Sequence, residues 1–350
     1  MKKIINMLIF CLLLSGFSLQ DQWAAGVSTA SGAAKVQEAV QGRSLKPGDT
    51  IGVLAPASCD DIDEMQNAIK YLQDLGYKVK LAPSCRAQYG YFAGTDFQRA
   101  ADINHFFADD EVAAILCMRG GYGSARVLDK LDYQLISQHP KQFIGYSDIT
   151  ALHAVMQEKS HLATVHGPML SSLETDSPAK AYTRENFAKG ISGKLYPGKV
   201  PMPAGQTLQT INPGRAEGPI IGGNLTMIQS LLGTPYEIKG DGAILLIEDV
   251  GESAYGIDRT LQQLWQNGLL SRVSGVIVGD FSGADDDYEE GDFYLDDVLE
   301  YYAKLSGKPW LKGMPVGHGS NNVYLPLGVK AVMQANEDGT ASLSIEADKG

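Results

Sequence analysis

Residues 112–117 form an uninterrupted apolar run, Val-Ala-Ala-Ile-Leu-Cys, which narrowly limits how the chain can fold. A strand that is apolar on both sides must be covered on both faces, as the strands of a parallel sheet are. Further short apolar strands are expected at 50–56, 77–81 and 143–145, and helical patterns separate them. Strands that alternate with helices predict an α/β fold with a doubly wound parallel sheet.

Composition divides the chain into segments. Glycine, proline and short polar residues dominate 191–217, which we interpret as a linker between an N-terminal domain over 45–190 and a smaller C-terminal α/β domain over 218–350. The second domain is expected to end in a hairpin within 329–345. Residues 27–44 are rich in alanine, serine and glycine and predict a flexible lead-in to the folded part.

The N-terminus has the order of charge and apolar residues that is typical of a secretory signal peptide. Lys2 and Lys3 precede an apolar run over 7–14, which is too short to be interpreted first as a membrane-spanning helix. We therefore expect residues 1–26 to be a signal peptide and the protein to be exported, with the periplasm as its location.

The charge balance argues against nucleic acid as a partner. The chain has 29 lysines and arginines against 41 aspartates and glutamates, a formal net charge of −12. No long basic run or basic face is evident, and such a feature is what binding to a phosphate backbone needs.

The cysteines do not indicate a metal or redox site. Cys11 lies in the expected signal peptide, and Cys59, Cys85 and Cys117 lack CxxC spacing. Cys59 and Cys85 each follow an expected strand, so a disulfide between them is one alternative, and unpaired buried cysteines are the other.

Ser147 lies in the segment Gly-Tyr-Ser-Asp, between an expected strand and an expected helix. This position places a hydroxyl at the carboxyl edge of the sheet, beside the first free amides of a helix, which favour a developing negative charge. A serine nucleophile is one interpretation. A helix N-cap is the other, and it is the usual role of a serine before a helix.

Two later segments supply the other groups that a serine hydrolase needs. An apolar strand ends in Glu248 and Asp249, and His318 lies between two glycines. A serine nucleophile requires a base and a third group that orients the base. The acids could instead cap a helix and the histidine could occupy an ordinary turn, but their occurrence together with Ser147 favours a triad.

A glycine-rich turn over 119–123, Arg-Gly-Gly-Tyr-Gly, follows the apolar run. Its spacing and its place after the third expected strand differ from the dinucleotide fingerprint, so no nucleotide cofactor is predicted. An amide of Gly120 or Gly121 could join that of Asp148 in an oxyanion hole, because both turns lie at strand ends on one edge of the sheet.

Together these segments resemble the LD-carboxypeptidase family of serine peptidases, which also includes the microcin C self-immunity protein. Each motif alone is common, but the set is specific and extends from about residue 45 to the end of the chain. The matching segments are 119–123, 145–148, 166–168, 222–225, 247–249, 257–259 and 317–319.

The resemblance implies a triad of Ser147, Glu248 and His318, an oxyanion hole from the amides of Gly121 and Asp148, and no metal or other cofactor. It also implies a homodimer whose chains have an N-terminal Rossmann-like domain and a C-terminal β-rich swivelling domain. Family members release the terminal D-alanine from murein tetrapeptides or hydrolyse a related acyl-sulfamoyl adenylate peptide.

Arg119 and Asn224 lie in matching segments and are the residues expected to bind substrate, although Asn224 is equally well placed to cap a helix. Many relatives are cytoplasmic, so export would change the substrate pool to murein itself or to released muropeptides. Two other functions stay open, a microcin C-like amide hydrolase with the same triad and an exported solute-binding protein without chemistry. The occurrence of a serine, a glutamate and a histidine in this order along the chain argues against the solute-binding protein.

The signal peptide can be tested directly. A fusion of residues 1–27 to a reporter should export the reporter, and the mature N-terminus should lie between about residues 19 and 28. N-terminal sequencing of the protein from fractionated cells measures both. An intact Met1 on cytosolic protein would contradict the prediction.

Overall fold

The computed structural model describes residues 39–174 and 180–347. The expected signal peptide over 1–26 lies outside these residues, as does the lead-in up to residue 38. Within the described ranges, no helix combines the length and the apolar character that a membrane span requires.

The first sheet is doubly wound, as predicted. Its parallel strands follow the order β3-β2-β4-β5-β6. This is the flavodoxin-like order, which differs from the dinucleotide-binding order of the Rossmann fold. The strands are β2 (Thr50–Leu54), β3 (Lys78–Leu81), β4 (Val112–Cys117), β5 (Gln142–Gly145) and β6 (Leu162–His166).

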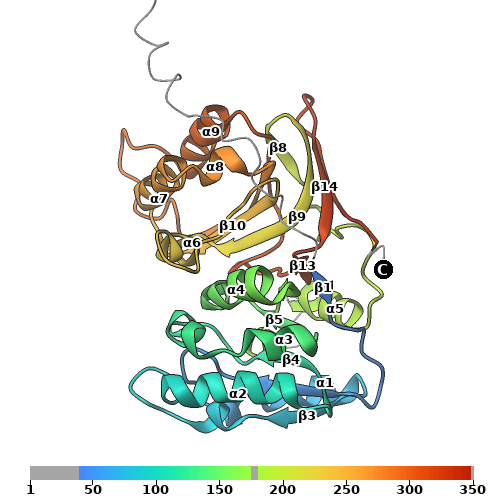
Figure 1. Ribbon diagram of the computed structural model, residues 1–350. Coiled ribbons are helices and arrows are strands. Elements are labelled where there is room, and N and C mark those ends of the chain that lie inside the picture. The colour runs from blue at the N-terminus through green and yellow to red at the C-terminus, as the bar shows by residue number, and fades with distance from the viewer. Residues whose placement is uncertain (1–38, 175–179, 348–350) are drawn as a thin grey trace, which may run out of the picture. The chain divides into compact units, whose positions relative to one another are not determined.

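Helices cover both faces of this sheet (Figure 1). One face packs against α2 (Asp96–Ala108), α3 (Tyr133–Gln138) and α4 (Thr150–Ser160), and the other against α1 (Gln66–Asp74) and α5 (Ala181–Ile191). Because successive side chains of a strand point to opposite faces, the apolar run of β4 contributes to both cores. The prediction that this strand is buried on both sides is confirmed.

The second sheet is mixed, with the order β7-β15-β14-β9-β10-β11-β12-β8. Its central strands β9 to β12 are parallel and the outer strands are antiparallel to their neighbours. The predicted hairpin is present as β14 and β15. The strands are β7 (Gly198–Lys199), β8 (Gln209–Asn212), β9 (Gly214–Asn224), β10 (Ile244–Val250), β11 (Gly275–Ser282), β12 (Trp310–Lys312), β14 (Lys330–Ala335) and β15 (Ala341–Ile345).

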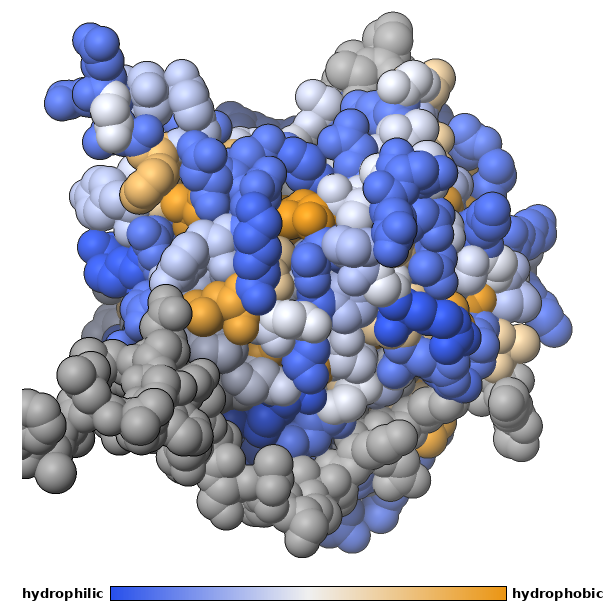
Figure 2. All heavy atoms as spheres, turned by 90° about the horizontal axis from the view of Figure 1, so that it is seen from above, coloured by the Kyte–Doolittle hydropathy of each residue, from blue (hydrophilic) through white to orange (hydrophobic). Residues whose placement is uncertain are grey.

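Helices pack on one face of the second sheet and bury a core that includes Trp310 and Tyr302. These helices are α6 (Leu225–Leu231), α7 (Ala254–Gln266), α8 (Leu269–Arg272) and α9 (Leu295–Ser306). The face of the molecule seen from above in Figure 2 is mostly hydrophilic with small separate apolar groups, in keeping with the charged composition.

Two segments expected to be irregular contribute strands. Within the predicted flexible lead-in over 27–44, β1 (Val40–Gln41) pairs with β6, and the predicted linker over 191–217 contains β7 and β8. Pairing at a sheet edge satisfies backbone groups whatever the side chains are, so composition did not reveal it.

The two sheets share a border. Strand β13 (Leu325–Leu327), from the C-terminal part of the chain, pairs antiparallel with β6 of the first sheet. Helix α4 contacts both β9 and α6, and it lies between the sheets in Figure 1. The carboxyl ends of β5, β9 and β10 are thereby brought together.

The border should contribute strongly to stability. Leu325 of β13 is fully buried, so Leu325→Ala should lower the free energy of unfolding by about 2–5 kcal/mol through lost burial and a residual cavity. Urea unfolding of the purified protein measures this change. Leu305→Ala on α9, where the side chain is 37% exposed, is the control and should change it far less. Equal effects of the two substitutions would show that burial of Leu325 at the border contributes no particular stability.

Candidate active site

Ser147 lies at a sharp turn between strand and helix. β5 ends at Gly145, and Ser147 opens the 3-10 turn η5 (Ser147–Ile149) that leads into α4. Its φ of 64° lies in the left-handed region, which is strained for a residue with a side chain and is typical of nucleophile elbows. The Ser147 side chain caps neither η5 nor α4, so the N-cap alternative is wrong.

The structure brings Ser147, His318 and Glu248 into one hydrogen-bonded chain. His318 Nε2 lies 3.0 Å from Ser147 Oγ, and His318 Nδ1 lies 2.8 Å from Glu248 Oε2. A carboxylate only accepts, so the imidazole donates from Nδ1 and leaves Nε2 free to accept the serine proton. The Glu248 side chain is 0% exposed and that of His318 is 17% exposed.

Burial and pairing act in opposite directions on the two titratable groups. Burial lowers the pKa of His318, but the hydrogen bond and negative charge of Glu248 outweigh it, so the pKa is raised above its usual 6.5. Burial raises the pKa of Glu248, and the hydrogen bond from His318 opposes that shift. The pair therefore favours an imidazole that binds a proton more readily than a free histidine does.

Local backbone features place Glu248 against His318. The pairing of β10 with β11 shifts register between Ile247 and Asp249, which allows a strand to re-aim a side chain. Gly317 has a φ of +115°, and a Cβ there would lie 2.6 Å from Glu248 Oε2. Glycine is therefore required before His318 for the carboxylate to approach the ring.

The residues proposed for an oxyanion hole flank Ser147. A Cβ on Gly120 would lie 3.0 Å from Ser147 Cβ, so the loop after β4 touches the serine directly. The amides of Gly121 and Asp148 donate no hydrogen bond to any residue that the structure describes. Asp148 follows Ser147 directly and Gly121 follows Gly120, so these two amides are the candidate donors for a tetrahedral oxyanion.

The side chain of Asp148 has a structural contact of its own. It is buried, and Oδ2 accepts a hydrogen bond from the Ser124 amide at 2.8 Å. Burial raises the pKa of Asp148, and the hydrogen bonds from Ser124 oppose the shift. This contact ties the turn after β5 to the segment that follows the glycine-rich loop.

Asn224 and Arg119 both have protein partners. Asn224 Oδ1 accepts from the Met227 amide at 3.1 Å and Nδ2 donates to Asp249 Oδ1 at 2.9 Å, so its side chain caps α6. Arg119 Nη1 donates to Asp60 Oδ2 at 2.8 Å, and its side chain remains 38% exposed. The capping alternative thus describes the Asn224 side chain in this structure.

Two contacts around the site were not predicted from the sequence, those of Tyr146 and of Asp249. Tyr146 packs its ring edge-on to His318 with the centroids 5.1 Å apart. Asp249, next to Glu248 on the strand, holds Asn224 and also accepts from the Thr226 amide at 2.9 Å. Tyr146 is adjacent to the serine in sequence, but nothing in the motif reveals its contact with a histidine more than 100 residues later.

The cysteines in the described part of the chain are unpaired, and two of them are buried. The three cysteines in the described part of the chain, Cys59, Cys85 and Cys117, are all free, so the structure has no Cys59–Cys85 disulfide. Burial raises the pKa of Cys85 to about 12, which keeps the thiol protonated. Among the described residues, no group of three or more His, Cys, Asp or Glu side chains is arranged to hold a metal ion.

Comparison with protein families gives two matches in one family. Residues 51–167 match the LD-carboxypeptidase N-terminal domain, and residues 217–333 match the LD-carboxypeptidase C-terminal domain. The first match contains Ser147 and the second contains Glu248 and His318.

Individual relatives agree with the family match. The probable murein peptide carboxypeptidase of Bacillus subtilis strain 168 is 41% identical over 84% of this chain and 92% of its own length. The murein tetrapeptide carboxypeptidase of Pseudomonas aeruginosa PAO1 is 31% identical over 82% and 93%. The crystal structure of an MccF-like protein from Bacillus anthracis Ames has a TM-score of 0.80 at 27% identity and covers 88% of this chain and 100% of its own.

The histidine predicts a specific pH dependence. If His318 acts as a base, kcat/KM should fall as the pH falls through its raised pKa, so the acid limb should lie above pH 6.5. Glu248→Gln removes the charge that raises this pKa, so the limb should move to lower pH. By analogy with serine proteases, kcat should drop on the order of 10⁴-fold.

Peptide release measured over a pH series tests this prediction. Glu300→Gln, on the exposed surface of α9, serves as the charge-matched control and should leave the profile in place. If the acid limb stays in position in Glu248→Gln, the pH dependence does not arise from the Glu248–His318 pair.

Proposed function

This chain belongs to the LD-carboxypeptidase family, and we propose that it releases the terminal D-alanine from murein tetrapeptides through Ser147, His318 and Glu248. The observation that carries the proposal is the hydrogen-bonded chain from Ser147 Oγ through His318 to the buried Glu248. Family membership makes the protein a serine-type carboxypeptidase and decides against the non-catalytic solute-binding protein.

The geometry supports an acyl-enzyme route. Ser147 Oγ attacks the carbonyl carbon before the terminal D-alanine while His318 Nε2 accepts the hydroxyl proton. As the C–N bond breaks, His318 returns that proton to the leaving amine. Water then attacks the ester with His318 again as base, and Glu248 stabilises the imidazolium at both stages.

Backbone amides complete the proposed machinery. The amides of Gly121 and Asp148 would receive the negative charge that develops on the carbonyl oxygen. Arg119, still 38% exposed, is our candidate for pairing with a substrate carboxylate. Asn224 would act on substrate through the cap that it forms with Asp249 rather than with a free side chain.

A second substrate has its own support. The similarity to an MccF-like structure favours hydrolysis of a microcin C-like amide by the same triad. An acyl-sulfamoyl adenosine offers the same kind of carbonyl beside a different leaving group. It therefore belongs in the assay beside the tetrapeptide.

We also propose that the enzyme is a periplasmic homodimer. Export is supported by the charged and apolar order of residues 1–26, and the dimer by the resemblance to the family. In the periplasm the enzyme would meet murein or released muropeptides directly.

Incubation of the mature protein with a defined D-alanine-terminated tetrapeptide, followed by mass analysis, tests the function. The wild type should release D-alanine, and Ser147→Ala should lower kcat by roughly 10⁴-fold or more while the melting temperature stays near that of the wild type. Ser137→Ala, at an exposed serine of α3, should keep full activity.

Two outcomes would contradict the proposed function. Undiminished release by Ser147→Ala would remove the serine from the mechanism. Turnover of the acyl-sulfamoyl adenosine alone, with no release of D-alanine, would show that the triad acts on the second substrate instead.

A further inference from the structure

Two exposed tyrosines lie beside the loop that touches Ser147. Tyr122 is the second residue after Gly120 and is 47% exposed, and Tyr91 is 62% exposed. Their ring centroids are 6.2 Å apart with an interplanar angle of 42°. We call this pair the tyrosine platform. Large exposed rings at the loop that touches Ser147 are a feature that the triad chemistry does not use.

The platform has a buried aromatic support. Phe92 is 6% exposed and contacts both rings, with centroids 4.3 Å from Tyr91 and 5.8 Å from Tyr122. The guanidinium groups of Arg99 and Arg126 each lie 4.9 Å from the Phe92 centroid. Aromatic and cation–π contacts of this kind hold the supporting ring in place.

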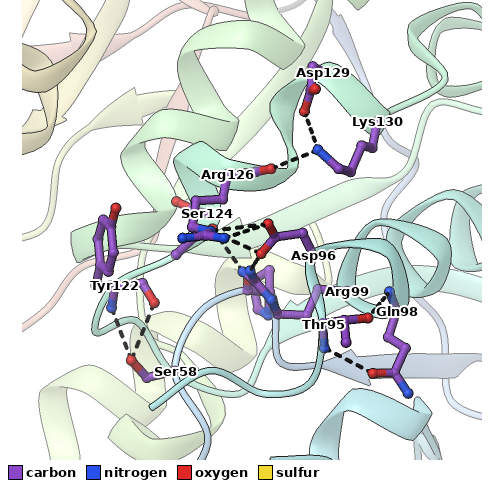
Figure 3. Close-up of polar contacts among 12 residues, drawn as sticks. Ser58, Thr95, Asp96, Gln98, Arg99, Tyr122, Ser124, Arg126, Asp129 and Lys130 are labelled. Carbon is purple, nitrogen blue, oxygen red and sulfur yellow. Dashed lines mark hydrogen bonds and ion pairs between the residues drawn. The ribbon is translucent and has the colours of Figure 1, made fainter. Parts of the chain in front are cut away.

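The backbone under the platform is also held at several points (Figure 3). Ser58 Oγ accepts from the Tyr122 amide at 3.0 Å, and the Ser58 amide donates to the Gly120 carbonyl at 3.3 Å. The fully buried Arg99 donates to the carbonyls of Pro56 at 2.6 Å and Gly123 at 2.8 Å. A ligand on these rings would therefore lose little free energy to ordering the loop.

The charges beneath the platform are already paired. Arg99 and Arg126 both bond to Asp96, as Figure 3 shows. The rings present apolar faces and phenolic hydroxyls above a cluster in which one carboxylate pairs with two guanidinium groups. Exposed ring faces with hydroxyls at their edges suit a ligand that has one apolar face and a polar edge, which is the character of a pyranose ring.

We propose that the tyrosine platform binds the N-acetylhexosamine rings of a muropeptide whose peptide stem enters the site of Ser147. The inference rests on the proposed function and narrows its substrate class to tetrapeptides that still carry their sugar. Stacking on Tyr91 and Tyr122 would hold the glycan, and the triad would act on the far end of the stem.

Kinetics with two matched substrates test the platform. The wild type should show a KM for N-acetylglucosaminyl-N-acetylmuramyl tetrapeptide about 10-fold below that for the same tetrapeptide without sugar. The double variant Tyr91→Ala/Tyr122→Ala should lose this difference through a raised KM for the sugar-linked substrate. Its kcat/KM for the free tetrapeptide should stay within about 2-fold of the wild-type value.

Two further variants separate ring stacking from general damage. Tyr91→Phe/Tyr122→Phe keeps the ring faces and should retain the preference for the sugar-linked substrate. Tyr301→Ala, at a tyrosine of α9 that is 58% exposed, should leave the KM for both substrates unchanged. An equal loss on both substrates in the double alanine variant would overturn the proposal.

Binding of a sugar without peptide keeps this test independent of turnover. The neutral disaccharide of two N-acetylglucosamine units should bind weakly to the wild type in saturation-transfer NMR, and the double alanine variant should lose the signal. No signal with the wild type would overturn the platform proposal, whatever the peptidase assay gives. Binding without any peptidase activity would retain the platform and remove the proposed function.

Discussion

A buried carboxylate is costly unless an opposite charge or a hydrogen-bond donor satisfies it, and His318 supplies the donor for Glu248. Its Oε2 lies 2.8 Å from the imidazole, whereas Oε1 has no hydrogen-bond partner among the described residues. The dependence is mutual, because the same bond fixes the ring so that Nε2 faces Ser147. The reactivity of the site and the tolerance for a buried acid thus rest on one hydrogen bond.

The complete hydrogen-bonded chain from Ser147 to Glu248 forms where the two sheets meet. Ser147 follows β5 of the first sheet, Glu248 ends the core of β10 in the second, and His318 lies between β12 and β13. Strand β13 then pairs with β6, so the segment that carries His318 is fixed to both sheets. The strained backbone of Ser147 costs about 1–3 kcal/mol of stability, and packing of this kind can offset that cost.

The adjacent acids Glu248 and Asp249 make separate contacts at the border between the sheets. Successive residues of a strand point to opposite faces, and accordingly Glu248 faces His318 while Asp249 faces the start of α6. Asp249 accepts a hydrogen bond from the Asn224 side chain, and the backbone amide of Asn224 donates to Thr150 Oγ1 of α4 at 2.9 Å. Through these contacts the acid beside the triad member links the helix after Ser147 to the second sheet.

Local patterns determined much of this protein. The apolar run of β4 specified a strand buried on both faces, and the alternation around it specified a doubly wound sheet. Ser147, Glu248 and His318 could be named from sequence because their chemistry limits what such residues do together. Their roles in catalysis stay proposals, but the structure places them within hydrogen-bonding distance of one another.

Tertiary structure decided what depends on contacts between distant segments. Composition marked 191–217 as a linker, yet β7 and β8 lie there because the edges of the second sheet offer backbone partners. The capping role of Asn224, the packing of Tyr146 on His318 and the pairing of Tyr91 with Tyr122 likewise arise between segments that only the fold brings together. Sequence patterns reflect the conformational preferences of residues that are close together in the chain. These contacts instead depend on how whole strands and helices pack.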